Sequence, residues 1–204
     1  MRRSKANWNG VIDMQRINSK TLAHTVLLPI LAAAKCVVDA TAGNGHDTVF
    51  LAEHSTSDCS VYAFDIQQDA LDATKRLAEE RGTAEKVRLI HDSHANVDAY
   101  IDGKIDAAMF NLGYLPSGDH TVTTEADSTI EAIRTIARKL SVGGMITVVS
   151  YSGHESGAHE QERLLAELSA FPVSCYTVST FRMINHKETA PMLFLIEKVR
   201  CELP

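Results

Sequence analysis

The chain has 204 residues, of which 45% are hydrophobic and 23% charged, and 20 basic residues against 26 acidic ones give a formal net charge of −6. This length favours one globular domain, the composition excludes wholesale disorder, and the negative charge argues against a protein that coats nucleic acid without specificity. The four cysteines are widely spaced without a CxxC pair, and no hydrophobic stretch has the length of a membrane span. We therefore expect no metal site and no membrane segment, and a soluble protein of the cytoplasm.

Residues 1–17 are predicted to form a polar arm, and residues 18–204 a single domain. A helix begins with Ser19 as its cap and runs through Leu31, with Pro29 as a kink or the start of a second turn. Short hydrophobic runs then alternate with amphipathic segments, which predicts a parallel sheet covered by helices on both faces. The predicted strands are 36–38, 60–64, 87–90, 105–110 and 145–149, and the clearest helices are 70–81 and 129–140, the latter with a capping box of Ser128 and Glu131.

The end of the chain breaks this alternation. Residues 173–183 and 192–199 are two strand-like runs, and the segment between them is too short for a crossover helix. Such strands can only be joined as an antiparallel hairpin.

A glycine-containing turn follows the first predicted strand. Gly43 and Gly45 remove side chains where the backbone approaches a ligand or takes a positive φ, and Asp39 precedes them. Thr48 stands where a dinucleotide-binding motif has its third glycine, which argues against a pyrophosphate ligand. A two-glycine turn behind an acid better suits an ammonium and a carboxylate, as in the methionine part of S-adenosylmethionine. A tight strand-to-helix turn without a ligand is the open alternative.

Polar residues also follow the next two predicted strands. Asp65 lies 22 residues beyond Gly43, where a carboxylate in a nucleotide-binding sheet accepts hydrogen bonds from both ribose hydroxyls. Ser93 and His94 follow the third strand, whose end faces the adenine in this sheet order. Structural alternatives remain open, because Asp65 could instead cap the helix that begins near Gln67, and Ser93 could cap a helix or lie in a solvated loop.

The fourth predicted strand ends in Asn111-Leu112-Gly113-Tyr114, which resembles the N-P-P-Y loop of amino-group methyltransferases with both prolines replaced. Methyl transfer is an in-line displacement from a sulfonium, so the attacking nitrogen needs a free lone pair. We expect the Asn111 amide oxygen and the Leu112 carbonyl to accept the N–H bonds of the amine, and Tyr114 to stack on a base. The alternative is a turn with Tyr114 in the core.

A primary amine of this kind titrates near pH ~10 and arrives protonated, so either a dry site or a nearby base must remove its proton. His154, which follows the fifth predicted strand, is the expected base, and His120 is a second candidate. The alternative for each is an ordinary surface histidine.

Together these motifs resemble the rRNA methylase family of class I S-adenosylmethionine-dependent methyltransferases over residues 23–198. The resemblance implies a Rossmann-like α/β domain with a seven-stranded, mostly parallel sheet and an antiparallel terminal hairpin. It rests most specifically on residues 38–48, 62–67 and 110–116, with matches at Tyr151, Gly153, His154, Gly157 and Asn185. It implies cofactor contacts from Asn44, Asp47, Asp65, Gln67, Ser93 and His94.

The resemblance also implies a reaction, the N-methylation of the 5-aminomethyl group on the wobble 2-thiouridine of tRNA. An anticodon loop is a small single-stranded target with splayed bases, which local cations of an acidic protein can bind. Those cations are either Arg134, Arg138 and Lys139 or Arg182, His186 and Lys187.

Other functions stay open at this point. They are methylation of another RNA such as rRNA or of a small amine, S-adenosylmethionine binding without catalysis, and a nicotinamide dehydrogenase, which the missing third glycine disfavours. Pairing of sheet edges or helix faces into a homodimer is also left open.

Overall fold

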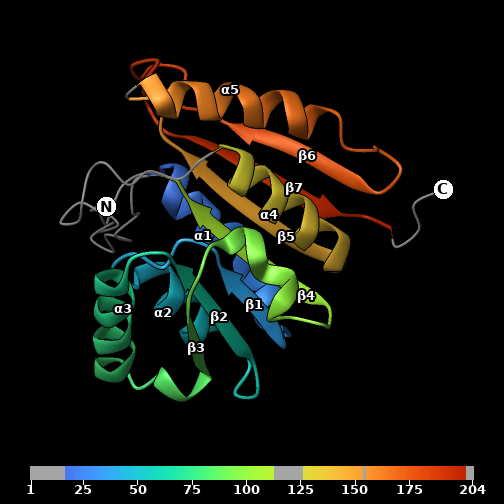
Figure 1. The fold of residues 1–204 in the computed structure, drawn as a ribbon. Coiled ribbons are helices and arrows are strands. Elements are labelled where there is room, and N and C mark those ends of the chain that lie inside the picture. Colours follow the sequence, from blue (N-terminus) through green and yellow to red (C-terminus); the bar gives the residue numbers. More distant parts are fainter. Residues whose placement is uncertain (1–16, 113–125, 154, 201–204) are drawn as a thin grey trace, which may run out of the picture.

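The computed structural model describes residues 17–112, 126–153 and 155–200, and in them seven strands form one sheet in the order β3-β2-β1-β4-β5-β7-β6 (Figure 1). Strands β1 to β5 run parallel, whereas β7 is antiparallel to both β5 and β6. The predicted seven-stranded Rossmann-like sheet with an antiparallel terminal hairpin is thereby confirmed. The strands are β1 (Cys36–Asp39), β2 (Ser60–Asp65), β3 (Val87–His91), β4 (Ile105–Asn111), β5 (Leu140–Ser150), β6 (Tyr176–Phe181) and β7 (Met192–Lys198).

Helices cover both faces of this sheet, as the alternating pattern predicts. Helices α1, α2 and α3 pack on one face, and α4, α5 and the short 3-10 helix η2 pack on the other. The helices are α1 (Ser19–Leu31), α2 (His46–His54), α3 (Gln68–Glu80), η1 (Ala84–Lys86), η2 (His94–Ala99), α4 (Ala126–Lys139) and α5 (Glu155–Ser169). No helix in these described segments has the length and hydrophobicity to cross a membrane.

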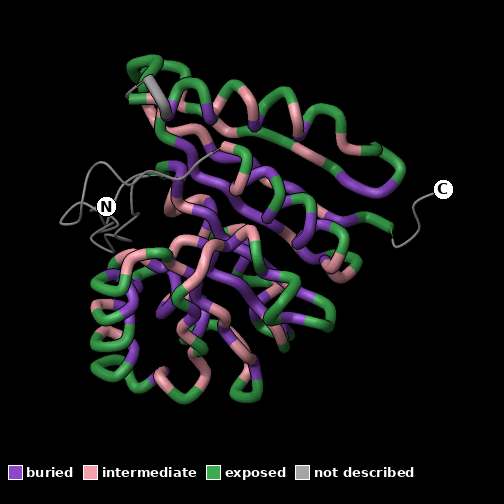
Figure 2. Tube along the Cα trace, viewed as in Figure 1, coloured by how far each residue is buried: buried purple, intermediate pink, exposed green. Residues whose placement is uncertain are grey.

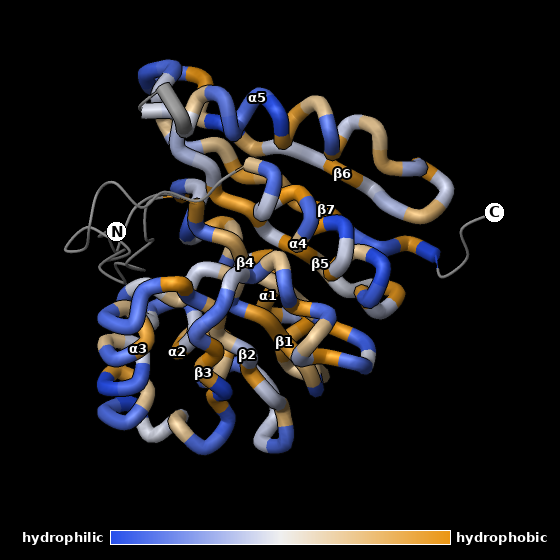
Figure 3. The backbone as a smooth tube through the Cα atoms, in the orientation of Figure 1, coloured by the Kyte–Doolittle hydropathy of each residue, from blue (hydrophilic) through white to orange (hydrophobic). Residues whose placement is uncertain are grey.

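The central strands β1 and β4 are hydrophobic without alternation because both of their faces are buried, whereas β3 and β6 at the two ends of the sheet are more exposed. In β1, Val37 packs in the cluster with α1, and its neighbour Val38 packs in the cluster with α4. Buried residues follow the strands, and exposed residues follow the outer faces of the helices (Figure 2). Figure 3 shows the matching hydropathy, with hydrophobic residues concentrated along the strands.

The beginning of α1 differs from the prediction. The cap is Asn18, whose side chain accepts a hydrogen bond from the backbone N–H of Thr21, rather than Ser19. Ser19 is the first helical residue and donates its hydroxyl to the carbonyl of Pro191, 2.7 Å away. Pro29 lies inside the helix, only two residues before its end.

The boundary between α4 and β5 also differs. Helix α4 begins at Ala126, so Ser128 already lies in its first turn and does not cap it with Glu131 as predicted. Strand β5 begins at Leu140, directly after the helix, because Leu140 pairs with Ile105 across a register shift in β4.

Candidate functional site

The polar residues of the sequence motifs meet at one edge of the sheet. Parallel strands present their carboxyl ends together, and the strand order reverses between β1 and β4, which is where open α/β sheets bind ligands. The described candidates lie at or just after the ends of β1 (Asp39, Gly43, Asn44, Gly45 and Asp47), β2 (Asp65 and Gln67), β3 (Ser93 and His94) and β4 (Asn111). Tyr114 and His154, as well as His120, lie outside the described residues.

The glycine turn needs both of its glycines. Gly43 and Gly45 have φ values of 53° and 83°, in the left-handed region that disfavours other residues. A Cβ on Gly45 would also lie 2.7 Å from the Cα of Thr74 in α3, so α2 and α3 meet here backbone to backbone. Gly45 is the N-cap of α2 and supplies no capping side chain. The amide groups at the start of α2 therefore stay available to a ligand.

Asp39 lies beneath this turn, with no exposed surface. One carboxylate oxygen accepts a hydrogen bond from the backbone N–H of Thr41 (3.1 Å), and the other from the hydroxyl of Thr48 (2.6 Å). Burial, and then the nearby charge of Asp47, raise the pKa of Asp39 to about 7. Both oxygens thus accept hydrogen bonds from the turn itself, and a direct contact of Asp39 with a ligand stays a prediction.

Asp65 joins the turn to the end of β2. Its carboxylate accepts hydrogen bonds from the backbone N–H groups of Gly43 (2.9 Å) and Gln67 (3.0 Å). Each oxygen keeps a further lone pair, so the carboxylate can still accept two ribose hydroxyls. The alternative that Asp65 is the cap of α3 is wrong, because the N-cap is Gln67.

His94 is a buried acceptor without a partner in the described part of the chain. Its Nδ1 lies 2.9 Å from the carbonyl oxygen of Ala40, which can only accept, so Nδ1 carries the proton and Nε2 presents a lone pair. That Nε2 is buried and has no hydrogen-bond partner there. Burial lowers the pKa of His94, so the ring is neutral. An exocyclic amine of adenine is the kind of donor that would satisfy this atom, and the site in this respect fits S-adenosylmethionine.

Ser93 has the structural role that was left open for it. Its hydroxyl accepts a hydrogen bond from the backbone N–H of Ala95 (3.2 Å) and caps η2. The hydroxyl proton is still available to a ligand.

A cluster around Asp47 orients Asn111. The side-chain nitrogen of Asn111 donates to Oδ2 of Asp47 (3.3 Å), and its backbone N–H donates to the hydroxyl of Thr41 (2.8 Å). A carboxylate can only accept, so the amide nitrogen must be the atom that faces Asp47. The amide oxygen of Asn111 is therefore the atom left to accept N–H bonds from a ligand.

Two residues that the sequence analysis missed complete this cluster. Oδ1 of Asp47 binds Nε2 of His24 (2.7 Å) and Nζ of Lys20 (3.2 Å), both on α1. The His24 ring stacks on Phe50 with 3.8 Å between the ring centroids. Burial raises the pKa of Asp47, but the hydrogen bond from His24 and the charge of Lys20 outweigh it, so the net shift is downward and Asp47 is ionised.

Lys20 and His24 were detectable only as a basic pair spaced by four residues, beside the buried stripe of Ala23 and Leu27. Such a pair usually lies on a solvent-exposed face of a helix. Nothing in the local pattern indicates that it binds a carboxylate 23 residues further along the chain. Partial burial, and then the charge of Asp47, raise the pKa of the Tyr151 phenol.

A metal centre has no ligand set in the ranges that the structure covers. No group of three or more histidine, cysteine, aspartate or glutamate side chains there could hold a metal ion.

Comparisons with known proteins agree with this geometry. Residues 61–197 match the family model described as "Putative rRNA methylase". The tRNA (mnm(5)s(2)U34)-methyltransferase, chloroplastic, of Arabidopsis thaliana is 33% identical over 193 residues, covering 90% of this chain and 70% of the relative.

Two solved structures are similar over nearly their whole length. A putative rRNA-methylase from Clostridium thermocellum has a TM-score of 0.88 at 39% identity, covering 91% of this chain and all of the other. A putative methyltransferase from Streptococcus mutans in complex with SAH has a TM-score of 0.82 at 35% identity, covering 90% of this chain and 99% of the other.

Proposed function

The chain belongs to the "Putative rRNA methylase" family and is an S-adenosylmethionine-dependent methyltransferase, and from this premise we propose that it N-methylates the 5-aminomethyl group of wobble 2-thiouridine in tRNA. The observation that carries the proposal is Asn111, whose amide Asp47 orients with its oxygen left to accept an amine. The Arabidopsis relative, which is named for the methylated form of this nucleotide, supports the same substrate.

The cofactor is proposed to lie across the ends of β1, β2 and β3. The turn with Gly43, Asn44 and Gly45 binds the methionine part, Asp65 accepts the ribose hydroxyls, and His94 accepts the adenine amine. Gln67 and Ser93 line the same end of the site. Bound there, S-adenosylmethionine supplies an electrophilic methyl group at the reversal point between β1 and β4.

Asp39 and Asp47 are proposed to hold other parts of the site in place. Asp39 accepts hydrogen bonds from Thr41 and Thr48 and so fixes the turn, and Asp47 accepts one from the side-chain nitrogen of Asn111 and so orients that amide. Asp47 also borders the methionine part of the cofactor, as the family resemblance implies. Lys20 and His24 keep Asp47 ionised, and an ionised carboxylate accepts the stronger hydrogen bond.

The amine must be neutral when it attacks. The free ammonium has a pKa of about 10, so one proton has to leave before the nitrogen lone pair can form its bond to carbon. The amide oxygen of Asn111 then accepts a remaining N–H and directs the lone pair. His154 stays the proposed base and Tyr114 the proposed stacking residue.

The decisive experiment is nucleoside mass spectrometry of tRNA that carries 5-aminomethyl-2-thiouridine, after incubation with the protein and S-adenosylmethionine. We expect this nucleoside to become heavier by one methyl group, and the Asn111→Ala variant to convert it far more slowly. An unchanged nucleoside, from a protein that binds S-adenosylhomocysteine in calorimetry, would contradict the substrate. Parallel reactions with rRNA and with small amines would then identify the alternative acceptor.

We also propose that the protein acts on the anticodon loop of tRNA, lies in the cytoplasm and forms a homodimer. A synthetic anticodon stem–loop with the modified nucleotide should be methylated about as well as whole tRNA. Cell fractionation and sedimentation analysis check the other two.

A further inference from the structure

The reversed direction of β7 brings a cationic turn to the edge that carries Asn111. We call residues 182–191, which join β6 to β7, the β6–β7 turn. Across the sheet, Asn111 pairs with Val149, and Val149 pairs with Leu193, two residues beyond the turn. Neighbouring strands lie about 4.8 Å apart, so the backbone of Leu193 is about 10 Å from that of Asn111, and the turn ends two residues before Leu193.

Contacts to neighbouring elements fix this turn. The hydroxyl of Ser19, at the start of α1, donates to the carbonyl of Pro191 (2.7 Å). Ser19 directly precedes Lys20, which binds Asp47 and through it Asn111. Two internal backbone hydrogen bonds, from His186 to Met183 (3.2 Å) and from Ala190 to Lys187 (2.9 Å), tighten the turn. A short series of contacts therefore connects the turn to the site.

The side chains of the turn face solvent with unbalanced positive charge. Arg182, His186 and Lys187 are exposed, and none of them has an ion pair with another described residue. Glu188 is the one acidic residue in the turn, and Ile184 beside these cations is 91% exposed. In a protein with a net charge of −6, such a patch has to attract a polyanion locally.

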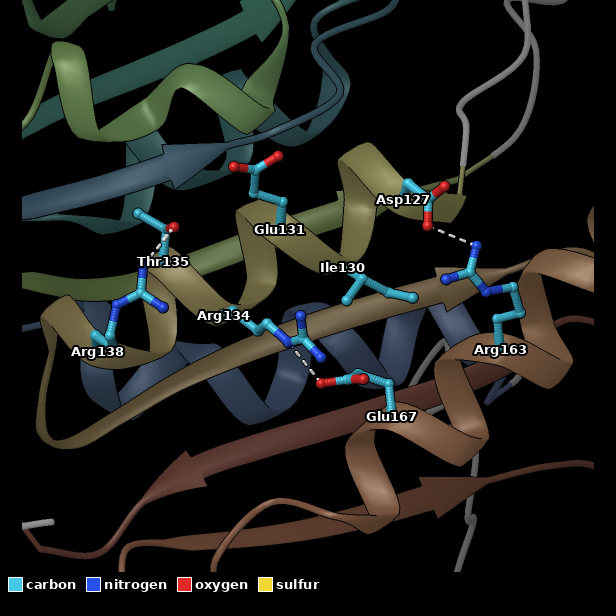
Figure 4. A pocket seen from close by; sticks show the side chains of 8 residues that line it. All are labelled: Asp127, Ile130, Glu131, Arg134, Thr135, Arg138, Arg163 and Glu167. Carbon is cyan, nitrogen blue, oxygen red and sulfur yellow. Dashed lines mark hydrogen bonds and ion pairs between the residues drawn. The ribbon is translucent and has the colours of Figure 1, made fainter.

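In the other set of basic residues, on α4, two of the three side chains have carboxylate partners, whereas Arg138 donates to the hydroxyl of Thr135. Arg134 pairs with Glu167 of α5 and Lys139 pairs with Asp98, each at 2.6 Å. A groove of about 400 Å³ between α4 and α5 contains the first of these pairs (Figure 4). In the same groove Arg163 pairs with Asp127, again at 2.6 Å. Arg134, Lys139 and Arg163 thus have carboxylate partners, which makes them poorer competitors for phosphate than unpaired cations.

Topology also separates the two sets. Helix α4 runs from the edge that carries Asn111 toward the opposite edge, where β5 begins at Leu140 beside Ile105. Lys139 therefore lies far from the site, whereas the β6–β7 turn borders it.

We propose that the β6–β7 turn is the surface that binds single-stranded RNA beside the target nucleotide, an inference that rests on the proposed function. Arg182 and Lys187 bind phosphates that flank the target, while His186 and Ile184 contact neighbouring unstacked bases. Phosphate contacts position a nucleic acid, and bases splayed from a loop leave their faces open to such side chains.

Paired charge reversals test this surface. The variant Arg182→Glu/Lys187→Glu is compared with Arg134→Glu/Arg138→Glu, which changes the charge equally on α4. Binding of an anticodon stem–loop is followed by fluorescence anisotropy at several salt concentrations. We expect the turn variant to bind at least about 10-fold more weakly, with a log–log salt slope smaller by about 1.4, from two lost single-strand phosphate contacts. The α4 variant should bind like the unchanged protein.

Further measurements separate the possible failures. Both variants should bind S-adenosylhomocysteine unchanged, since all four side chains are exposed. The turn variant should keep its melting temperature, whereas the α4 variant loses the pair of Arg134 with Glu167 and should melt somewhat lower. The proposed RNA-binding surface would be wrong if the turn variant bound RNA as tightly as the unchanged protein, or if the α4 variant lost more affinity for RNA than the turn variant. RNA binding that depends on the turn, without methylation of tRNA by the unchanged protein, would instead contradict the proposed function. Poly-U should compete with the stem–loop and polyglutamate should not; equal competition would exclude RNA as the specific partner.

Discussion

The edge of the sheet that carries the candidate site has two sides that are built differently. At the ends of β1, β2 and β3, Asp39, Asp65 and His94 each bind backbone groups that are close in the fold. At the end of β4 and in the β6–β7 turn, the orienting contacts reach α1, and several charged groups stay exposed. The first side is preorganised for one small ligand. The second presents groups that a large, variable substrate can approach.

The largest effect is expected on the side of β4. Replacing Asn111 with alanine removes the acceptor that we propose directs the amine, and misplacement of a reacting group by about 1 Å costs on the order of 100-fold. We expect kcat on tRNA to fall by about that factor while cofactor affinity is retained. Asn96→Ala, which removes an exposed asparagine that binds Asp92, is the control and should keep its activity. Equal losses in both variants would remove the special role of Asn111.

The turn after β1 should respond through stability instead. Gly45→Ala places a Cβ at a φ of 83° and 2.7 Å from the backbone of Thr74. We expect a loss of about 2–3 kcal/mol and a melting temperature lower by about 4–10 °C. Gly82→Ala also places a side chain at a positive φ, of 66°, but its Cβ would have no atom within 4 Å. Its smaller loss of stability therefore measures the cost of the backbone conformation alone. Similar melting temperatures for the two variants would show that the contact between α2 and α3 is not tight.

Glu160 adds a pH-dependent test between α4 and α5. It is 7% exposed, accepts a hydrogen bond from Thr129, and burial raises the pKa of its carboxyl to about 7. The folded state holds its proton more tightly than the unfolded chain, so this stabilisation is complete below pH ~4.5 and is lost as the pH rises through ~7. Glu160→Gln should therefore be more stable than the unchanged protein at pH 8, by roughly 1–3 kcal/mol, and similar to it at pH 4.5. Urea unfolding at both values checks this, and an equal difference at both would contradict the assignment.

His94 should give the smallest change. His94→Phe removes the Nε2 acceptor while keeping an aromatic ring of similar size against Phe110. One lost hydrogen bond corresponds to about 1 kcal/mol, so S-adenosylhomocysteine should bind roughly 5–10-fold more weakly in calorimetry. His91→Phe, at an exposed position three residues earlier, is the control. Unchanged affinity in His94→Phe would mean that the adenine does not reach Nε2.

The same contrast explains what the sequence could predict. Hydrophobic runs between turns predicted the positions of the strands. The spacing of Gly43 and Asp65 was also informative, because this fold places two such residues at the ends of neighbouring strands. The orientation of Asn111 was hidden, because Asp47 is 64 residues away from it and His24 a further 23. The cap of α1 was misplaced by one residue, since Asn18 and Ser19 can both cap and only the contact of Ser19 with Pro191 decides between them.

The position of β7 has a consequence for synthesis on the ribosome. Strand β6 joins the sheet only through β7, which is made after it and inserts between β5 and β6. Strand β6 therefore stays unpaired until β7 has emerged from the exit tunnel. During that interval β5 has an open edge, which exposes the nascent protein to wrong pairing at the stage when most of the molecule is already built.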